Sequence, residues 1–272
     1  MEHLPTPPGL ATGDNVDLAL QVGAALDRTD TSWNWPSSQI PGKAYEGRTI
    51  GDLMLGERML PHRNKHGERF CNEAAHNVAF AFEERDALGS LVNVPAWAIL
   101  DSQYRAKYPL MFKYMPGSRD PAWLIKAGTL GELAGKIGVD AERLRQTISR
   151  FNANVQAGRD LDFGRGQSGY ERALGDRRAM HSNLGAVDTS PYYALPVYSS
   201  AVGTRGGAKT DEHGRVLRSD GTVIVGLCGA GNAVAGFFGR NIMAGGVTIM
   251  SAMTFARRAI LHTLRAERGS AI

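Results

Sequence analysis

The chain has 272 residues, of which 43% are hydrophobic and 21% are charged, and its formal net charge is +4. This composition is typical of a globular protein that buries a core, and it excludes a largely disordered chain. Basic and acidic residues alternate without any block of like charge, so we expect no nucleic-acid partner. No apolar run reaches the ~18 residues of a membrane span, so we expect no transmembrane segment. The two distant cysteines, Cys71 and Cys228, favour a reduced, cytoplasmic protein.

The N-terminal part combines one expected helix with irregular segments. The first ten residues are rich in proline and are predicted to be irregular. A helix follows, with Thr12 or Asp14 as its N-cap. Its apolar side would consist of Val16, Leu18, Leu20, Val22 and Leu26. Residues 30–48 are predicted to form a loop, and residues 64–67 (Asn-Lys-His-Gly) a turn in a hairpin.

The middle of the chain carries the clearest helical pattern. Residues 91–101 form an apolar run that suits a buried strand. Residues 129–157 predict two helices: Thr129 and Glu132 form a capping box for the first, and Asp140 can cap the second. One face of the second helix would carry Leu144, Ile148 and Phe151, with Gly158 as its stop. Residues 160–190 are predicted to be a long connection.

The C-terminal part is predicted to contain two strands and a helix. The strands are KTDEHGRVL (209–217) and SDGTVIVGL (219–227), joined at the hairpin turn Asp220-Gly221. Val223, Ile224 and Val225 would make the second strand a buried one. From about Gly246 the pattern is helical to the end.

Residues 221–257 carry the pattern that points to chemistry, because a buried strand runs into Gly-Ala-Gly-Asn, a glycine-rich loop and the start of a helix. Glycines let the backbone approach a flat ligand closely. A helix N-terminus offers free N–H groups and partial positive charge, which suit a phosphate or the N1/O2 edge of a reduced flavin. A glycine-rich packing turn between strand and helix is the alternative that spacing alone leaves open.

A resemblance to a known family follows from several segments in order. Residues 203–233 resemble the C-terminal FAD-binding region of the 3-ketosteroid dehydrogenase and fumarate reductase flavoproteins, with Gly206-Gly207, Asp211 and the strand-loop Gly226–Asn232 in the family's places. Further matches are ATGDNVDLALQVGAAL, GERFCNEAA, PAWAILDSQYRAKYP, TISRFNANVQAGRDLDFGRG and TIMSAMTFARRA. The resemblance therefore covers nearly the whole chain.

The resemblance implies an α+β fold with FAD as cofactor. Residues 31–196 would form the substrate-binding cap domain, and residues 1–30 and 197–272 would be parts of a Rossmann-like FAD-binding domain. Hydride would pass from a substrate carbon to the flavin. The cofactor-binding residues implied are Gly207, Ala230, Gly231, Asn232, Gly246, Val247, Thr248 and Ile249.

The sequence departs from the family in two places. No G-x-G-x-x-G follows a predicted strand, so the features that hold the ADP half of FAD are missing. In the glycine-rich loop, steroid dehydrogenases carry a tyrosine where we align Ile242, and fumarate reductases carry a histidine and an arginine where Phe238 and Ile242 stand. The family has another tyrosine after the NEA segment, where this chain has His76-Asn77. Isoleucine and phenylalanine cannot transfer a proton.

The remaining catalytic candidates are Gly246, whose N–H would bind the keto group, His76 as acid or base, and Tyr193. A capping or surface role for His76, and aromatic core packing for Tyr192 and Tyr193, stay open. Phe237 and Phe238 are either a pocket floor or core. The simplest interpretation makes Arg205 an exposed side chain and Arg69 and Glu73 hairpin charges.

Two functions are consistent with these features. The first is an FAD-dependent oxidoreductase that dehydrogenates a CH–CH group next to a ketone in a ketosteroid-like, apolar substrate, incomplete without an N-terminal FAD-binding half. The second is a truncated, inactive relative that binds a ligand or partner. Apolar residues such as Val223, Val225, Met250 and Phe255 would be exposed without neighbours, so we expect an oligomer or a complex with an N-terminal FAD-binding polypeptide.

Overall fold

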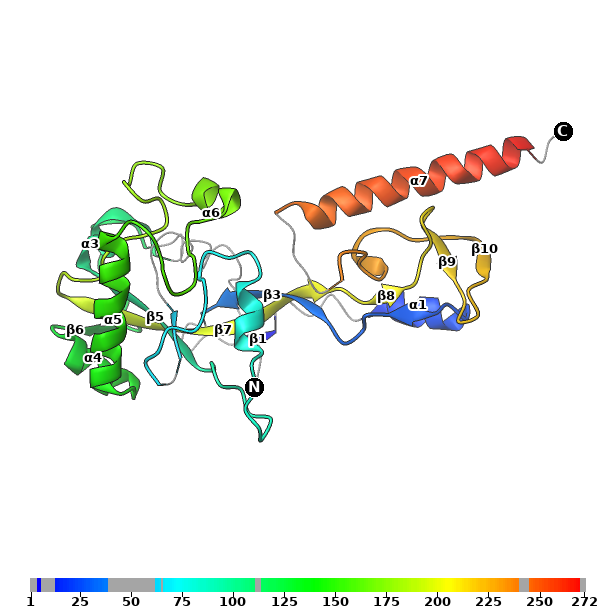
Figure 1. Ribbon diagram of the computed structural model, residues 1–272. Helices are drawn as coiled ribbons and strands as arrows, with labels where there is room; N and C mark the ends of the chain where they lie inside the picture. Colours follow the sequence, from blue (N-terminus) through cyan, green and yellow to red (C-terminus); the bar gives the residue numbers. More distant parts are fainter. Residues whose placement is uncertain are drawn as a thin grey trace. The chain divides into compact units, whose positions relative to one another are not determined.

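The computed structural model describes residues 4–5, 13–38, 62–64, 66–110, 114–239 and 245–269. The chain divides into two compact units. Unit 1 comprises residues 1–6 and 34–200, and unit 2 comprises residues 7–33 and 201–272. Figure 1 shows both units as mixtures of helix and sheet. An α+β composition is therefore confirmed.

Unit 1 is organised around the long strand β7 (Tyr192–Thr204), which continues into unit 2. The main path of its sheet runs β1–β7–β5–β4, and β3 and β6 also pair with β7. The bounds are Leu4–Pro5 for β1, Ser32–Ser37 for β3, His62–Arg63 for β4, Ala96–Asp101 for β5 and Ile125–Ala127 for β6. β5 is antiparallel to β7 with Ala98 opposite Leu195, and β6 is antiparallel to β7 with Lys126 opposite Tyr193.

Helices α4 and α5 of unit 1 pack on this sheet as the apolar pattern predicts (Figure 1). The bounds are Ser102–Lys107 for α3, Leu130–Ile137 for α4, Ala141–Gln156 for α5, Gly169–Leu174 for α6 and Val78–Phe82 for the 3-10 helix η2. The capping box of Thr129 and Glu132 and the Asp140 cap are both confirmed. Leu144, Ile148 and Phe151 are at most 2% exposed, and together with Ile99 and Leu133 they belong to one core cluster.

Several local predictions for unit 1 need correction. Leu4–Pro5 and Ser32–Ser37 are strands rather than irregular segments, because the long β7 offers them a pairing edge. The connection 160–190 contains helix α6, which Ser168 caps through a bond from the Glu171 N–H. The turn at Asn64–Gly67 is confirmed, with the Gly67 N–H donating to the Asn64 carbonyl.

The described part of unit 2 contains two small sheets, two α-helices and one 3-10 helix. Strand β2 (Leu26–Asp27) pairs with β8 (Gly207–Ala208), and β9 (Arg215–Leu217) pairs with β10 (Val223–Cys228). The helices are α1 (Asp14–Gln21), the 3-10 helix η3 (Gly231–Ala233) and α7 (Val247–Gly269). One core cluster consists largely of small residues: Ala19, Ala24, Ala208, Val216 and Ile224.

Two predictions about unit 2 are wrong. Helix α1 starts from Gly13 without a side-chain cap, and Leu18, Leu20 and Val22 are 62%, 55% and 46% exposed. Residues two apart point to different sides of a helix, so this set never formed one face. Val225 is 93% exposed, so β10 is not a strand buried on both sides. The turn at Asp220-Gly221 is confirmed by the bond from the Gly221 N–H to the Arg218 carbonyl.

Candidate functional site

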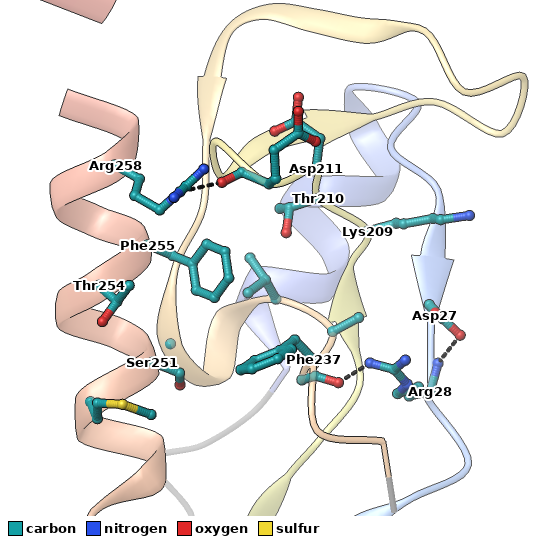
Figure 2. A pocket seen from close by; sticks show the side chains of 16 residues that line it. Asp27, Arg28, Lys209, Thr210, Asp211, Phe237, Ser251, Thr254, Phe255 and Arg258 are labelled. Carbon is teal, nitrogen blue, oxygen red and sulfur yellow. Dashed lines mark hydrogen bonds between the residues drawn. The ribbon is translucent and has the colours of Figure 1, made fainter. Parts of the chain in front are cut away.

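Unit 2 contains a cavity of about 640 Å³ between helix α7 and the segments that follow β2, β8 and η3 (Figure 2). Pockets for small ligands and cofactors have volumes of ~300–1,000 Å³. Its walls come from four segments: Asp27 and Arg28, Lys209–Glu212, residues 231 and 234–237, and residues 250, 251, 254, 255 and 258 of α7.

Glycines bring these segments close together. A Cβ on Gly207 would lie 2.5 Å from the carbonyl oxygen of Ala233, so only glycine allows β8 to approach η3. The Ala235 N–H donates to the Ala208 carbonyl at 3.0 Å across the same contact. Gly231 has φ +71°, and its Cβ would lie 3.2 Å from the Ala252 methyl of α7. The backbone of η3 is therefore placed directly against helix α7.

Two arginines of the cavity fix backbone carbonyls. Arg28 donates from Nη1 to the Gly236 carbonyl, and Arg258 donates from Nε to the Glu212 carbonyl at 2.5 Å. Figure 2 shows both side chains directed at these loops, while Lys209 extends away from α7. The guanidinium groups thus hold the loop after η3 and the turn after β8 in place.

Asp211 belongs to the segment that resembles the family's Gly-Gly-x-x-x-Asp pattern, and it lines the cavity. Burial alone would raise the pKa of Asp211, but hydrogen bonds from the backbone and side chain of Arg215 and from the His213 N–H hold it below its usual value. Its carboxylate accepts from Arg215 Nε at 2.6 Å. Asp211 is therefore a charged anchor for the turn.

Aromatic rings form the apolar part of the cavity. Phe237 and Phe255 line it with ring centroids 5.8 Å apart, and Phe238 lies 4.0 Å from Phe237. Figure 2 shows Phe255 projecting from α7 toward the loop that carries Phe237. Phe237 is 59% exposed and lines the cavity, so it is not a core residue, whereas Phe238 is not among the wall residues.

Helix α7 presents its first amides next to a glycine in the left-handed region. Gly246 has φ +83°, and the first helical bond runs from the Met250 N–H to the Gly246 carbonyl. The amides of Val247, Thr248 and Ile249 precede that bond, so the helix itself gives them no acceptor. Such a terminus attracts an anionic or electron-rich group.

The predicted cofactor-binding residues fall in two places of unit 2. Gly207, Ala230, Gly231 and Asn232 lie at β8 and η3, and residues 246–249 lie at the start of α7. Gly231 also lines the cavity, whereas the others are not among its wall residues. The structure brings η3 and α7 together through Gly231 and Ala252.

The predicted catalytic residues His76 and Tyr193 lie in unit 1. His76 is half-buried, and its ring meets that of Tyr170 edge-on at 4.5 Å. Tyr193 is 4% exposed, and Lys126 Nζ lies 5.2 Å from its ring centroid. A hydrogen bond to Asp120, with a second to Tyr193, raises the pKa of Lys126. Tyr192 packs on the core cluster of α4 and α5. Ile242 lies outside the described residues.

Three charges were misassigned from sequence. Arg69 donates to Glu73 at 2.7 Å and to Asp160 at 2.7 Å, and Arg165 donates to Glu73 at 3.1 Å. The four side chains are at most 3% exposed, so they form a buried ion network rather than hairpin charges. Arg205 is 1% exposed, with its guanidinium 4.2 Å above the ring of Trp33. Wide sequence separation, such as that between Arg69 and Asp160, hides such pairs.

Comparison with known proteins identifies the family. The family model described as the FAD binding domain matches residues 2–249, so the chain belongs to the FAD-binding domain family. The resemblance seen in the sequence, and FAD as the family's cofactor, are thereby confirmed. None of the described helices has both the length and the apolar character needed to cross a membrane.

Individual relatives make the likeness more specific. The 3-oxosteroid 1-dehydrogenase of Mycobacterium tuberculosis is 39% identical over 92% of this chain and 46% of its own length. The 4-oxocyclohexanecarboxylate 2-dehydrogenase of Sinomonas cyclohexanicum is 38% identical over 89% and 43%. The fumarate reductase (cytochrome) of Shewanella frigidimarina is 29% identical over 92% and 38%. The chain thus spans less than half the length of these relatives.

A solved structure shows the same fold. The 3-ketosteroid delta1-dehydrogenase from Sterolibacterium denitrificans, in complex with 1,4-androstadiene-3,17-dione, superposes with a TM-score of 0.85 at 34% identity. The match covers 96% of this chain and 48% of that one. The chain is therefore homologous to FAD-dependent oxidoreductases that include 3-ketosteroid dehydrogenases.

The residues of unit 2 fit the flavin end of FAD. Gly207 and Gly231 let η3 lie close to β8 and α7, since a Cβ there would meet Ala233 or Ala252, and α7 offers amides without helical acceptors. Gly164–Gly169 matches G-x-G-x-x-G in spacing, but it follows helix α5 and a loop instead of a strand, so it is no dinucleotide fingerprint. The fit therefore concerns the flavin end alone.

Proposed function

We propose that the chain is part of an FAD-dependent dehydrogenase that oxidises a CH–CH bond next to a ring ketone. The observation that carries the proposal is the contact between η3 and α7, where Gly231 meets Ala252 in the helix whose first amides, those of residues 247–249, have no helical acceptor. The chain's relatives include two enzymes named for oxidising ring ketones, an oxosteroid and an oxocyclohexanecarboxylate.

In this proposal each unit has one role. Residues 31–196, nearly the extent of unit 1, form the substrate-binding cap domain. Residues 1–30 and 197–272 form the C-terminal part of a Rossmann-like FAD-binding domain. The division of the chain at residues 33–34 and 200–201 supports these bounds. A closed core in unit 1 also supports them, since a cap domain folds around its own core.

FAD, when bound, would supply the hydride acceptor, and the protein would bind, orient and exclude water. Gly207, Ala230, Gly231 and Asn232 would let the cofactor approach the backbone. The amides of Val247, Thr248 and Ile249 would hold its electron-rich edge. The N–H of Gly246 would bind a substrate keto oxygen and stabilise negative charge there.

The proton acceptor is proposed to come from unit 1. Tyr193 is the first candidate, because a phenol hydroxyl can take up and release a proton and Lys126 Nζ lies 5.2 Å from the ring centroid. His76 is the second candidate, because an imidazole side chain can take up and release a proton. A ketosteroid or smaller cyclic ketone is the proposed substrate class, since the cavity of unit 2 carries phenylalanines and no pair of arginines free of backbone contacts.

We propose that unit 2 functions in a complex with a polypeptide corresponding to the part of its relatives that it does not match. Helix α7 exposes one apolar stripe: Ile249 (66%), Met253 (70%), Ile260 (61%) and Leu264 (46%). These positions lie within about 60° of one another on a helix of 3.6 residues per turn. Val225 adds an apolar side chain on β10, which pairs with β9 alone among the described strands. Exposed apolar surface of this kind indicates an interface.

The test is co-purification. The chain is expressed with the N-terminal half of the M. tuberculosis relative, and the flavin absorbance that stays with the complex in gel filtration is measured. Bound flavin, followed by reduction on adding 4-androstene-3,17-dione, would support the dehydrogenase. Flavin that binds without reduction by any ring ketone would leave a ligand-binding relative. No flavin in the complex would overturn the proposal.

A glycine pair provides the matched control. Gly231 and Gly239 both have positive φ, +71° and +64°, but among the described residues only a Cβ added to Gly231 would have a neighbour within 4 Å. Alanine strains the backbone equally at both positions. Only Gly231→Ala should push η3 away from α7, because only its Cβ would meet Ala252. FAD affinity should fall at least about tenfold in Gly231→Ala, a loss of ~1.4 kcal/mol, and stay near wild type in Gly239→Ala. Equal affinities would contradict the assignment of Gly231.

A further inference from the structure

We propose that the loops around helix α6 form a docking surface for anionic lipid membranes. Four exposed arginines define this arginine surface: Arg159, Arg172, Arg177 and Arg178. It lies in unit 1, outside the sheet and outside every residue assigned to the flavin or to catalysis (Figure 1). A role of this docking in the uptake of an apolar substrate would rest on the function proposed above. The docking itself does not depend on that function.

The acidic residues of the same loops are turned inward. Asp160 is 2% exposed and bound to Arg69, and Glu171 is 6% exposed and accepts from the Gly166 N–H. Asp162 pairs with Arg150. Hydrogen bonds from Lys107 and Tyr108 hold the pKa of Asp176 well below its usual value. The four acidic side chains thus form hydrogen bonds or ion pairs within unit 1.

The sequence of this region is nearly balanced in charge, but its surface is not. Between residues 157 and 182, every charged residue classed as exposed is an arginine. Arg150, whose side chain is 74% exposed beside Asp162, adds a further cation at the edge. Sequence analysis missed this surface because the arginines alternate with acids along the chain. The basic and acidic side chains of this region differ in how far they are buried, which the sequence does not show.

Contacts place the arginines on neighbouring loops. A Cβ on Gly158 would lie 2.8 Å from the His181 ring, which brings the loop after α5 beside the loop after α6. Arg159 directly follows Gly158 in the chain, and Met180 directly precedes His181. A Cβ on Gly166 would likewise lie 3.4 Å from the Cβ of Asn183. The arginines before and after α6 therefore belong to one surface.

Apolar side chains stand among the arginines. Met180 is 93% exposed, Leu161 is 64% exposed and Phe163 is 38% exposed. A bilayer interface accepts both kinds of group, because guanidinium groups bind headgroup phosphates while apolar side chains enter the acyl boundary. Single-stranded nucleic acid would instead call for several stacking aromatic residues. The combination favours an anionic bilayer over other anionic partners.

The test is sedimentation of the full chain with vesicles of phosphatidylcholine alone and of phosphatidylcholine with phosphatidylglycerol. Binding is expected to the anionic vesicles and to weaken in high salt. The double variant Arg177→Gln, Arg178→Gln should bind them about 30-fold more weakly, since each basic residue contributes about fivefold. Met180→Ser should weaken binding about fivefold through lost apolar insertion.

The matched control is Lys136→Gln with Arg143→Gln, which removes the same charge from the end of α4 and the start of α5. Arg143 lies 14 residues before Ala157, about 20 Å along the helix. This control should bind like the wild type, and circular dichroism should show all variants folded. Equal binding to neutral and anionic vesicles, equal loss in the control, or no vesicle binding would each overturn the proposal. Binding to heparin or DNA without vesicle binding would assign the surface to another polyanion and overturn it as well.

Discussion

The two units differ in how completely they bury their own apolar residues. Unit 1 encloses Ile99, Leu133 and Phe151 at 0–1% exposure and adds a buried ion network. Unit 2 has a core of mostly small residues and leaves Val225 and Met253 at 93% and 70% exposure. The sequences of both units have comparable apolar patterns. The difference supports the proposal that unit 1 carries its own stability, whereas unit 2 depends on a binding partner.

The largest expected effect concerns the ion network of unit 1. Glu73→Ala leaves Arg69 and Arg165 buried without their shared carboxylate, and the free energy of unfolding should fall by about 3–5 kcal/mol. Denaturant titration measures it. Glu142→Ala removes a carboxylate from an exposed pair with Arg145 and should leave the midpoint unchanged. Equal midpoints for both variants would show that the network does not stabilise unit 1.

A smaller effect is expected from steric contact in unit 2. Gly207→Ala places a Cβ 2.5 Å from the Ala233 carbonyl oxygen, so β8 must move away from η3. Overpacking of this kind costs about 1–3 kcal/mol. Gly135→Ala in helix α4, with nothing within 4 Å, should instead stabilise unit 1 by roughly 0.5–1 kcal/mol. Thermal unfolding distinguishes the two, and a stable Gly207→Ala would refute the close contact.

The apolar stripe of α7 should matter for association and not for folding. Met253→Ser with Ile260→Ser should weaken assembly with the N-terminal half of the relative about tenfold, through lost apolar burial of ~1.4 kcal/mol. Leu88→Ser with Met115→Ser in unit 1, at 91% and 55% exposure, is the control. Analytical ultracentrifugation measures both. Assembly equally tight in all variants would place the interface elsewhere.

The smallest effect is a pH dependence. The folded-state pKa of Asp211 is lowered, so its stabilisation is present above the unfolded value of about 3.9 and is lost as the pH falls through the folded pKa. Asp211→Asn should lose stability at neutral pH and show a shallower acid limb in unit 2. Asp176→Asn should do the same for unit 1, because its pKa is also lowered. Denaturation midpoints across acidic pH check both signs, and a steeper acid limb in either variant would contradict its assignment.

Local signals predicted helices α4 and α5 of unit 1 well. Thr129, Glu132 and Asp140 cap α4 and α5 as their spacing indicates, because capping depends on residues three apart. The start of α7 and the turn at Gly221 were predictable for the same reason. Strands β1 and β3 were not, because both depend on pairing with β7 more than 150 residues later.

The candidate site shows the same limit. The glycines at 207, 231 and 246 were identified from pattern and resemblance, and their close contacts or positive φ agree with a backbone site. Arg28 and Arg258 were missed, since their acceptors are carbonyls that carry no sequence signature. Val225 was predicted to be buried from its apolar neighbours, yet burial depends on a partner strand that a pattern within one strand does not reveal.

The most direct test of the difference between the units is amide hydrogen exchange of the chain alone and of the chain with FAD and the N-terminal half of the relative. The account predicts slow exchange in α5 and β5 under both conditions. In α7 and β10 it predicts fast exchange alone and slow exchange in the complex. Protection of α7 and β10 equal to that of α5 in the chain alone would contradict it.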